Sequence, residues 1–197
     1  MSRYIALEGV DGSGKSTVVT ALATRLREMG ETVVTVREPG GTPAGEVIRG
    51  LLLDTAHLDL RAEVLLFAAQ RAVLADEVVR PALERGDWVV SDRTYYSSLA
   101  YQGRARGVGE EWVRQVNEWA VDGLVPDLVV ILDVDPEEAL QRQHRADRIG
   151  SEGVDFQLQV RAAYLDMAER EAERVLVLEG GMGVEEMVDA ILERLGR

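Results

Sequence analysis

The chain of 197 residues contains no cysteine, only one lysine and no long hydrophobic run. Without cysteine it can form no disulfide bond and use no thiolate chemistry. No apolar stretch reaches the roughly 18 residues that a membrane-spanning helix needs. Met1 to Arg3 lead directly into a short apolar segment, so we expect no signal peptide. These absences favour a soluble, cytoplasmic protein that has no membrane partner.

Basic side chains are also few. The chain has 22 basic and 35 acidic residues, which gives a net charge of −13. A general nucleic-acid binder needs a basic surface, so we expect no nucleic-acid partner. A small anion bound in a local basic pocket remains compatible with this charge, and the length suits one domain with at most a small insert.

The single lysine, Lys15, lies in the glycine-rich segment "GVDGSGKSTV". This segment follows an apolar stretch over 4–8 and precedes a helical pattern over 15–29. A glycine, four residues and Gly-Lys-Ser/Thr in that context are typical of a P-loop. A glycine-rich turn that binds nothing is the alternative, and the flanking elements and the position of the lysine disfavour it. The predicted phosphate-binding residues are Gly9, Val10, Asp11, Gly12, Ser13, Gly14, Lys15, Ser16 and Thr17.

A P-loop predicts a nucleoside triphosphate ligand for physical reasons. Glycines let successive backbone N–H groups point at phosphate oxygens, and the helix that follows adds its positive end. Lys15 would reach the β- and γ-phosphates, and the Ser16 hydroxyl would bind Mg²⁺. A GTPase is excluded because its Asn-Lys-x-Asp motif needs a second lysine. The length does not suit a motor or transporter ATPase, so a small phosphotransferase is favoured.

Short apolar segments alternate with helical patterns along the whole chain. This alternation predicts an α/β fold in which helices cover both faces of a parallel sheet. We expect one three-layer domain over 1–197, of the P-loop kinase type. The expected strands are 4–8, 32–37, 88–92, 128–134 and 174–179. The expected helices are 15–29, 44–53, 61–84, 94–104, 110–121, one starting at Pro136, 154–173 and 184–195.

Three further segments leave the carboxyl edge of the predicted sheet, where ligands of open parallel sheets bind. They are "VREPGGTP", "FAAQR" and "SDRTYYSSLAYQG". Phe67 and Arg71 are four residues apart and share one helix face. Each residue alone could be core or surface, but their convergence on one sheet edge favours a second, anion-binding half of the site.

The segments "EGVDGSGKST", "VREPGGT", "FAAQR", "SDRTYYSSLAYQG" and "DRI", in this order, resemble bacterial thymidylate kinases of the nucleoside monophosphate kinase group. The resemblance implies transfer of the ATP γ-phosphoryl group to dTMP, with Mg²⁺ bound near Ser16 and Asp92. It implies that Phe67 stacks on thymine, that Arg71 contacts the base edge and that Tyr101 crowds the sugar 2′ position. The implied dTMP site is Asp11, Arg37, Glu38, Phe67, Arg71, Arg93, Ser98, Tyr101 and Gln102.

The resemblance also implies a small mobile lid over about 142–153. Some family members carry an arginine inside the P-loop, where this chain has Gly12; others supply it from the lid. The segment "RQHRADRIG" offers Arg142 for the adenine and Arg145 and Arg148 for the transferred phosphoryl group. The implied catalytic residues are therefore Asp11, Lys15, Arg93, Arg145 and Arg148.

Residues 62–83 are apolar almost all round, which predicts a helix covered on more than one side. Family members form homodimers through this region, so the resemblance implies a homodimer. Two other functions stay open at this point. One is a kinase for another small metabolite or nucleoside monophosphate. The other is a nucleotide-binding regulatory module without turnover.

Overall fold

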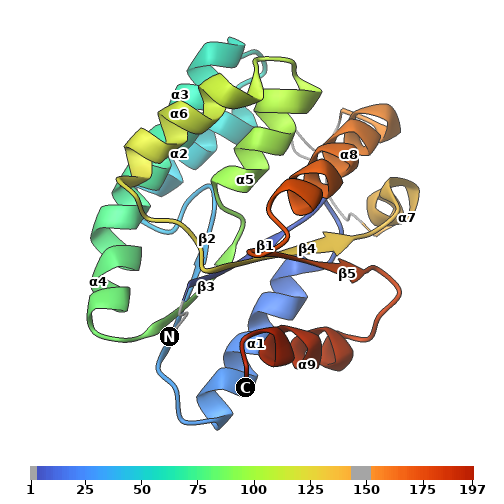
Figure 1. Cartoon of the computed structure of the whole chain (residues 1–197). Coiled ribbons are helices and arrows are strands. Elements are labelled where there is room, and N and C mark those ends of the chain that lie inside the picture. The colour runs from blue at the N-terminus through green and yellow to red at the C-terminus, as the bar shows by residue number, and fades with distance from the viewer. Residues whose placement is uncertain (1–3, 143–151) are drawn as a thin grey trace.

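The computed structural model describes residues 4–142 and 152–197. Its centre is a parallel sheet of five strands in the order β2-β3-β1-β4-β5 (Figure 1). This confirms the expected α/β fold with a five-stranded parallel sheet. The strands are β1 Tyr4–Glu8, β2 Val33–Arg37, β3 Trp88–Asp92, β4 Leu128–Asp133 and β5 Val175–Glu179.

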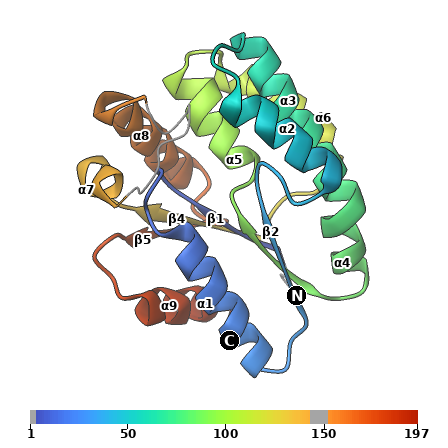
Figure 2. The same ribbon diagram turned by 180° about the vertical axis from the view of Figure 1, so that it is seen from behind.

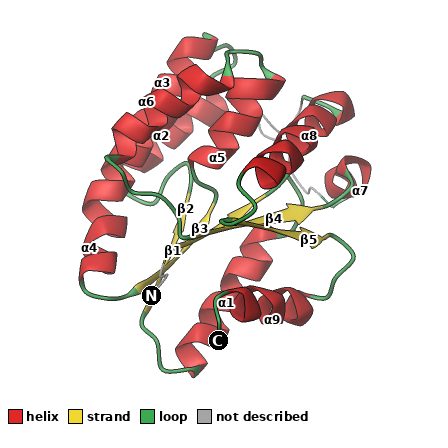
Figure 3. Cartoon of the chain, viewed as in Figure 1, coloured by secondary structure: helices red, strands yellow, loops and turns green. Residues whose placement is uncertain are grey.

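Helices cover both faces of this sheet, as Figure 3 shows by its colours. α1 and α9 lie on one face, and α2, α3, α5, α6 and α8 lie on the other (Figures 1 and 2). The elements are α1 Lys15–Glu28, α2 Pro43–Asp54, α3 Leu60–Leu74, η1 Ala75–Val79, α4 Arg80–Glu84, α5 Tyr95–Ser98, η2 Leu99–Ala105, α6 Glu110–Val121, α7 Pro136–Gln141, α8 Val154–Arg170 and α9 Val184–Arg194.

The alternation of side chains along β1 explains the two cores. Ile5 and Leu7 are fully buried against the α1 and α9 layer. Ala6 points to the opposite face and packs in the core beneath α5 and α8. Glu8 has the same parity as Ala6, so its carboxylate also enters that second layer. The period of two thereby places a charged side chain in the interior directly before the P-loop.

The helix expected over 61–84 differs from the structure. It divides into α3, the π-helical turn η1 and α4. Pro81 explains the change, because proline has no N–H to donate and its ring clashes with the carbonyl of the preceding turn. A wider turn before it accommodates the ring. Similarly, the helix expected over 94–104 consists of the short α5 and the π-helical η2.

No helix among residues 4–142 and 152–197 combines the length and apolar character needed to cross a membrane.

Candidate active site

The P-loop connects β1 to α1 and is pressed against α7. Gly12 and Gly14 have φ values of 82° and 92°, a region that glycine adopts without strain. A Cβ atom on Gly12 would lie 2.1 Å from the backbone oxygen of Ala139. The close approach of α7 therefore leaves no room for a side chain at position 12.

The Lys15 ammonium lies buried inside the loop that precedes it. It donates hydrogen bonds to the backbone oxygens of Val10 at 2.8 Å and Gly9 at 3.2 Å and to Ser13 Oγ at 3.3 Å. Burial and then the positive charge of Arg93 lower the pKa of Lys15 to about 8. The hydrogen-bond partners of the ammonium are neutral oxygens. Phosphate oxygens would add the negative charge that compensates the buried ammonium.

The two residues predicted to bind metal lie together beside Lys15. Ser16 Oγ donates to Asp92 Oδ2 at 2.5 Å, which joins the first turn of α1 to the end of β3. Hydroxyl and carboxylate oxygens are hard ligands of the kind that Mg²⁺ prefers, and Mg²⁺ sites typically combine one or two carboxylates with phosphates and water. The residues present therefore fit a Mg²⁺–nucleotide complex.

Arg93 follows Asp92 in a left-handed backbone conformation, with φ of 75°. For a residue with a side chain this is strained and needs support from its surroundings. Its N–H donates to Leu7 O at 3.0 Å, and its guanidinium contacts Ser97 Oγ at 3.0 Å and the Asp11 carboxylate. Burial opposes ionisation of Asp11, but the charges of Arg93 and Lys15 outweigh it and lower the pKa of that carboxyl.

Glu8 supplies much of the support for this turn. One carboxylate oxygen accepts from the Thr94 backbone N–H at 2.7 Å and from Thr94 Oγ1 at 2.8 Å. The other accepts from Ser97 Oγ at 2.6 Å and from Tyr164 Oη at 2.7 Å. A fully buried carboxylate is stable only when its oxygens are satisfied in this way. The same bonds fix the residues that follow Arg93 and join them to α8.

A cavity of about 300 Å³ opens beside the P-loop. All the residues predicted to bind dTMP line it, although their roles remain predictions. Lys15, Ser16 and Asp92 line its phosphate-loop end, so the two predicted halves of the site meet in one space. The dTMP residues on its wall are Asp11, Arg37, Glu38, Phe67, Arg71, Arg93, Ser98, Tyr101 and Gln102.

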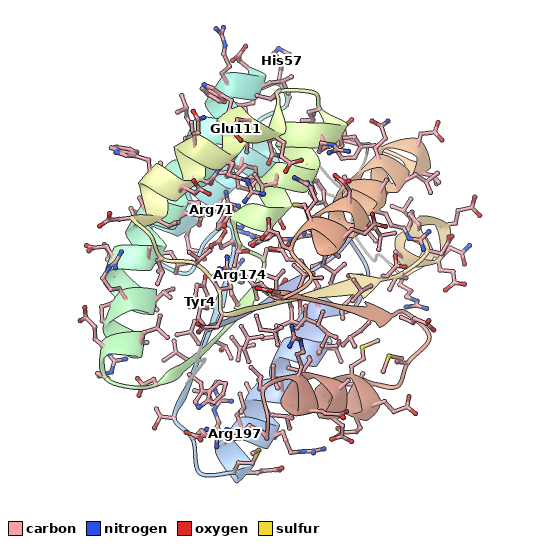
Figure 4. All side chains as sticks on the ribbon, viewed as in Figure 1. Tyr4, His57, Arg71, Glu111, Arg174 and Arg197 are labelled. Atoms are coloured by element: carbon pink, nitrogen blue, oxygen red, sulfur yellow. The ribbon has the colours of Figure 1, made fainter. Side chains whose placement is uncertain are left out.

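Arg71 lies in the interior of the helical layer above the sheet, whereas His57 lies at the outer tip of that layer (Figure 4). The Arg71 guanidinium forms an ion pair with Glu38 at 2.5 Å, and both side chains are buried. It also donates to Ser98 Oγ at 2.8 Å, Asn117 Oδ1 at 2.7 Å and Thr94 O at 3.1 Å. Bonds from several directions fix its plane before any ligand arrives.

Aromatic rings form two further contacts around the cavity. The Arg71 guanidinium carbon lies 5.4 Å from the centre of the Phe67 ring, and that of Arg93 lies 5.2 Å from the centre of the Tyr101 ring. Phe156 of α8 meets Tyr101 edge-on at 6.0 Å between ring centres. These contacts orient both predicted base- and sugar-facing rings.

The arginines predicted at the rim and in the lid have different surroundings. Arg37 is half-exposed and forms an ion pair with Glu46 at 2.8 Å. Arg142, at the end of α7, is exposed and lies 3.4 Å from Glu138. Arg145 and Arg148 lie outside the described residues, so the predictions on them stay predictions.

Several residues of the site were missed by sequence reasoning. Arg49 lines the cavity and donates to Pro39 O at 2.7 Å. Asn117 accepts a hydrogen bond from Arg71. Glu8 accepts hydrogen bonds from the turn that follows Arg93. Glu63 accepts a hydrogen bond from Gln102 at 2.8 Å. Its sequence position was a usable signal, because it lies four residues before Phe67 and therefore on the same face of α3. Asn117 had none, since only the tertiary fold brings α6 to Arg71.

The comparisons with known proteins agree with this geometry. The family model for thymidylate kinase matches residues 7–191. The chain belongs to the thymidylate kinase family. A thymidylate kinase of Bifidobacterium longum subsp. infantis is 45% identical over 194 residues, with 95% of this chain and 83% of the relative covered. One of Deinococcus radiodurans is 46% identical over 180 residues, covering 89% and 87%.

A solved structure gives the same result. The crystal structure of thymidylate kinase from Ehrlichia chaffeensis matches with a TM-score of 0.83 at 31% identity and covers 100% of this chain and 99% of its own. Family membership assigns to this chain the phosphorylation of dTMP and makes it a phosphotransferase. It gives no support to the other kinase or the regulatory module considered above.

We expect Glu8→Gln to destabilise the protein and to lower turnover. The amide would place a donor where the carboxylate accepts two hydrogen bonds, so the free energy of unfolding should fall by about 1–3 kcal/mol. The turn that carries Arg93 would lose support at the same time. Urea unfolding and steady-state kinetics measure the two effects. The exposed Glu28→Gln is the matched control, and equal behaviour of both variants would refute the role of Glu8.

Proposed function

We propose that this chain transfers the γ-phosphoryl group of ATP to the phosphate of dTMP, giving dTDP, through Asp11, Lys15 and Arg93. One observation carries the proposal. Asp11 and Lys15 of the phosphate loop line the acceptor cavity together with Arg93, which follows β3. Two anions that must react in line would therefore meet between fixed cations, which reduces their repulsion and orients them.

On the donor side, the P-loop amides and the start of α1 bind the triphosphate. Lys15 would contact the β- and γ-phosphates, and Ser16 and Asp92 would hold the nucleotide-bound Mg²⁺. The metal neutralises charge on the phosphates when it is bound. Because a phosphate oxygen of dTMP is already a nucleophile, no side chain needs to act as a general base.

On the acceptor side, arginines contact the dTMP phosphate and the inner residues contact the nucleoside. Arg37 and Arg93 suit the phosphate, because a guanidinium donates to phosphate oxygens in pairs. Phe67 suits the face of thymine, and Arg71 and Gln102 suit its hydrogen-bonding edge. Tyr101 is buried against Arg93, where its ring would crowd a ribose 2′-hydroxyl and so favour deoxyribose.

A second copy of the chain is proposed to cover the groove between α3 and α6. Apolar residues line this groove, and Trp119 and Leu65 are 85% and 53% exposed. The sequence predicts a helix over 62–83 that is covered on more than one side. In the described part of a single chain, the side of α3 that faces this groove is exposed. An exposed apolar face of this kind favours an interface, and a homodimer buries the same patch on both copies.

The substrates of this reaction are free nucleotides, which supports a place in the cytoplasm. The net charge of −13 makes nucleic acid an unsuitable partner.

We expect Lys15→Ala to lower kcat by roughly a hundredfold or more, since it removes a charge that stabilises the transition state. A coupled assay of ADP release with ATP and dTMP measures the loss. Arg25→Ala is the matched control on the same helix, because Arg25 contacts Glu185 and Asp189 of α9 and not the cavity. Near-normal turnover of the Lys15 variant would contradict the assignment of the phosphate loop.

We expect Trp119→Glu to convert a dimer into a monomer, because it places a charge in the middle of the apolar groove. Sedimentation velocity measures the oligomeric state. Met29→Glu changes a similarly apolar, exposed residue at the distant end of α1 and should leave the dimer intact. A wild-type protein that sediments as a monomer would rule out the homodimer.

A further inference from the structure

The α3 face that carries Phe67 and Arg71 also carries a fully buried carboxylate. Glu63, Phe67 and Arg71 are spaced by four residues along α3 and form one stripe. Glu63 Oε1 accepts a hydrogen bond from Gln102 Nε2 at 2.8 Å and lies 3.1 Å from Arg106 Nε. Arg106 in turn contacts Glu152 at 2.8 Å and lies over the Phe156 ring.

This contact decides which way round the Gln102 side chain lies. An ionised carboxylate only accepts hydrogen bonds, so the amide nitrogen of Gln102 must face Glu63. The Arg106 guanidinium lies beside the same Glu63 oxygen. The amide oxygen of Gln102 then points away from Glu63 and can accept a hydrogen bond from another group. Among the described residues none donates to this oxygen, and Gln102 lines the cavity.

Arg71, which also lines the cavity, provides the complementary group. A guanidinium has five N–H donors and no acceptor. Four of them are used by Glu38, Ser98, Asn117 and Thr94, which leaves one N–H. The cavity wall therefore carries one acceptor group, on Gln102, and one remaining donor group, on Arg71.

This pair matches one class of pyrimidine. Thymine and uracil present an N3–H donor beside the O4 acceptor, whereas cytosine presents an N3 acceptor beside an N4 amino donor. We propose that Glu63, held by Arg106, is a positioning residue that fixes the Gln102 amide so that the pocket accepts thymine and uracil and rejects cytosine. The proposal rests on the proposed contact of Gln102 and Arg71 with the base.

The test compares dTMP with dCMP as acceptor. In Glu63→Gln the neighbour of Gln102 can either donate or accept, so the Gln102 amide is free to turn over. We expect the ratio of kcat/KM for dTMP to that for dCMP to fall roughly tenfold or more, the effect of a hydrogen bond that no longer discriminates. A parallel loss with both substrates, at an unchanged ratio, would show a merely structural role and overturn the proposal.

The matched control is Glu152→Gln. It makes the same chemical change beside the same Arg106 guanidinium but does not contact Gln102. Its ratio should equal that of the wild type. A fall of similar size in Glu152→Gln would show that general loss of charge, and not the contact with Gln102, sets the ratio, and would also overturn the proposal.

The Gln102→Met variant separates the positioning role of Glu63 from the proposed contact of Gln102 with the base. If Gln102→Met lowers the ratio and Glu63→Gln does not, Gln102 contacts the base and Glu63 does not position it. If neither changes the ratio, the contact of Gln102 with the base is itself wrong, and the positioning role falls with it.

A measurement on the wild type covers the case in which Glu63→Gln does not fold. The side-chain amide protons of Gln102 are identified in a ¹H–¹⁵N NMR spectrum by their absence in Gln102→Met. They should exchange with solvent clearly more slowly than those of Gln115, which donate to Glu111 at the exposed surface. Equal exchange would mean that Gln102 is not held by a buried carboxylate, and would overturn the proposal.

Discussion

The buried carboxylate of Glu8 is the constraint on which the rest of the site depends. The alternation of side chains along β1 places it inside the helical layer, one residue before the P-loop. A buried charge of this kind is costly unless each oxygen is satisfied, and here the partners are Thr94, Ser97 and Tyr164. The phosphate loop, the turn that carries Arg93 and the helix α8 are thereby fixed relative to one another.

The same principle applies to the cavity beside the P-loop, where the protein satisfies most of its own charges without a ligand. Arg71 uses four of its five donors on protein groups, and Arg93 is paired with Asp11. The chain is acidic as a whole, yet cations outnumber anions on the cavity wall: Lys15, Arg37, Arg49, Arg71 and Arg93 stand against Asp11, Glu38 and Asp92. A strongly acidic protein thus has a cavity with an excess of positive side chains, and groups fixed in this way reorganise little when an anion binds.

Local sequence signals were sufficient for the framework and for part of the site. The apolar runs located every strand, and the spacing of Phe67 and Arg71 predicted that both lie on one side of the cavity. The loop around Lys15 predicts a phosphate site, which stays a prediction. The sequence could not predict contacts between distant segments, such as the bond between Glu8 and Tyr164, which are 156 positions apart. The left-handed backbone of Arg93 and the bond of Asn117 to Arg71 were missed for the same reason. Arg93 is held by contacts with Leu7, Ser97 and Asp11, and the Asn117 bond depends on the packing of α6 against α3. Neither has a local pattern.

Contacts within the protein alone build the pocket proposed for dTMP. Calorimetric titration of dTMP into the protein without ATP or Mg²⁺ tests this most directly. If the buried contacts of Glu8, Glu38 and Glu63 prearrange the pocket, dTMP should bind saturably at a single site per chain, and dCMP should bind clearly more weakly under the same conditions. Absence of dTMP binding until ATP is added, or equal binding of the two monophosphates, would contradict it.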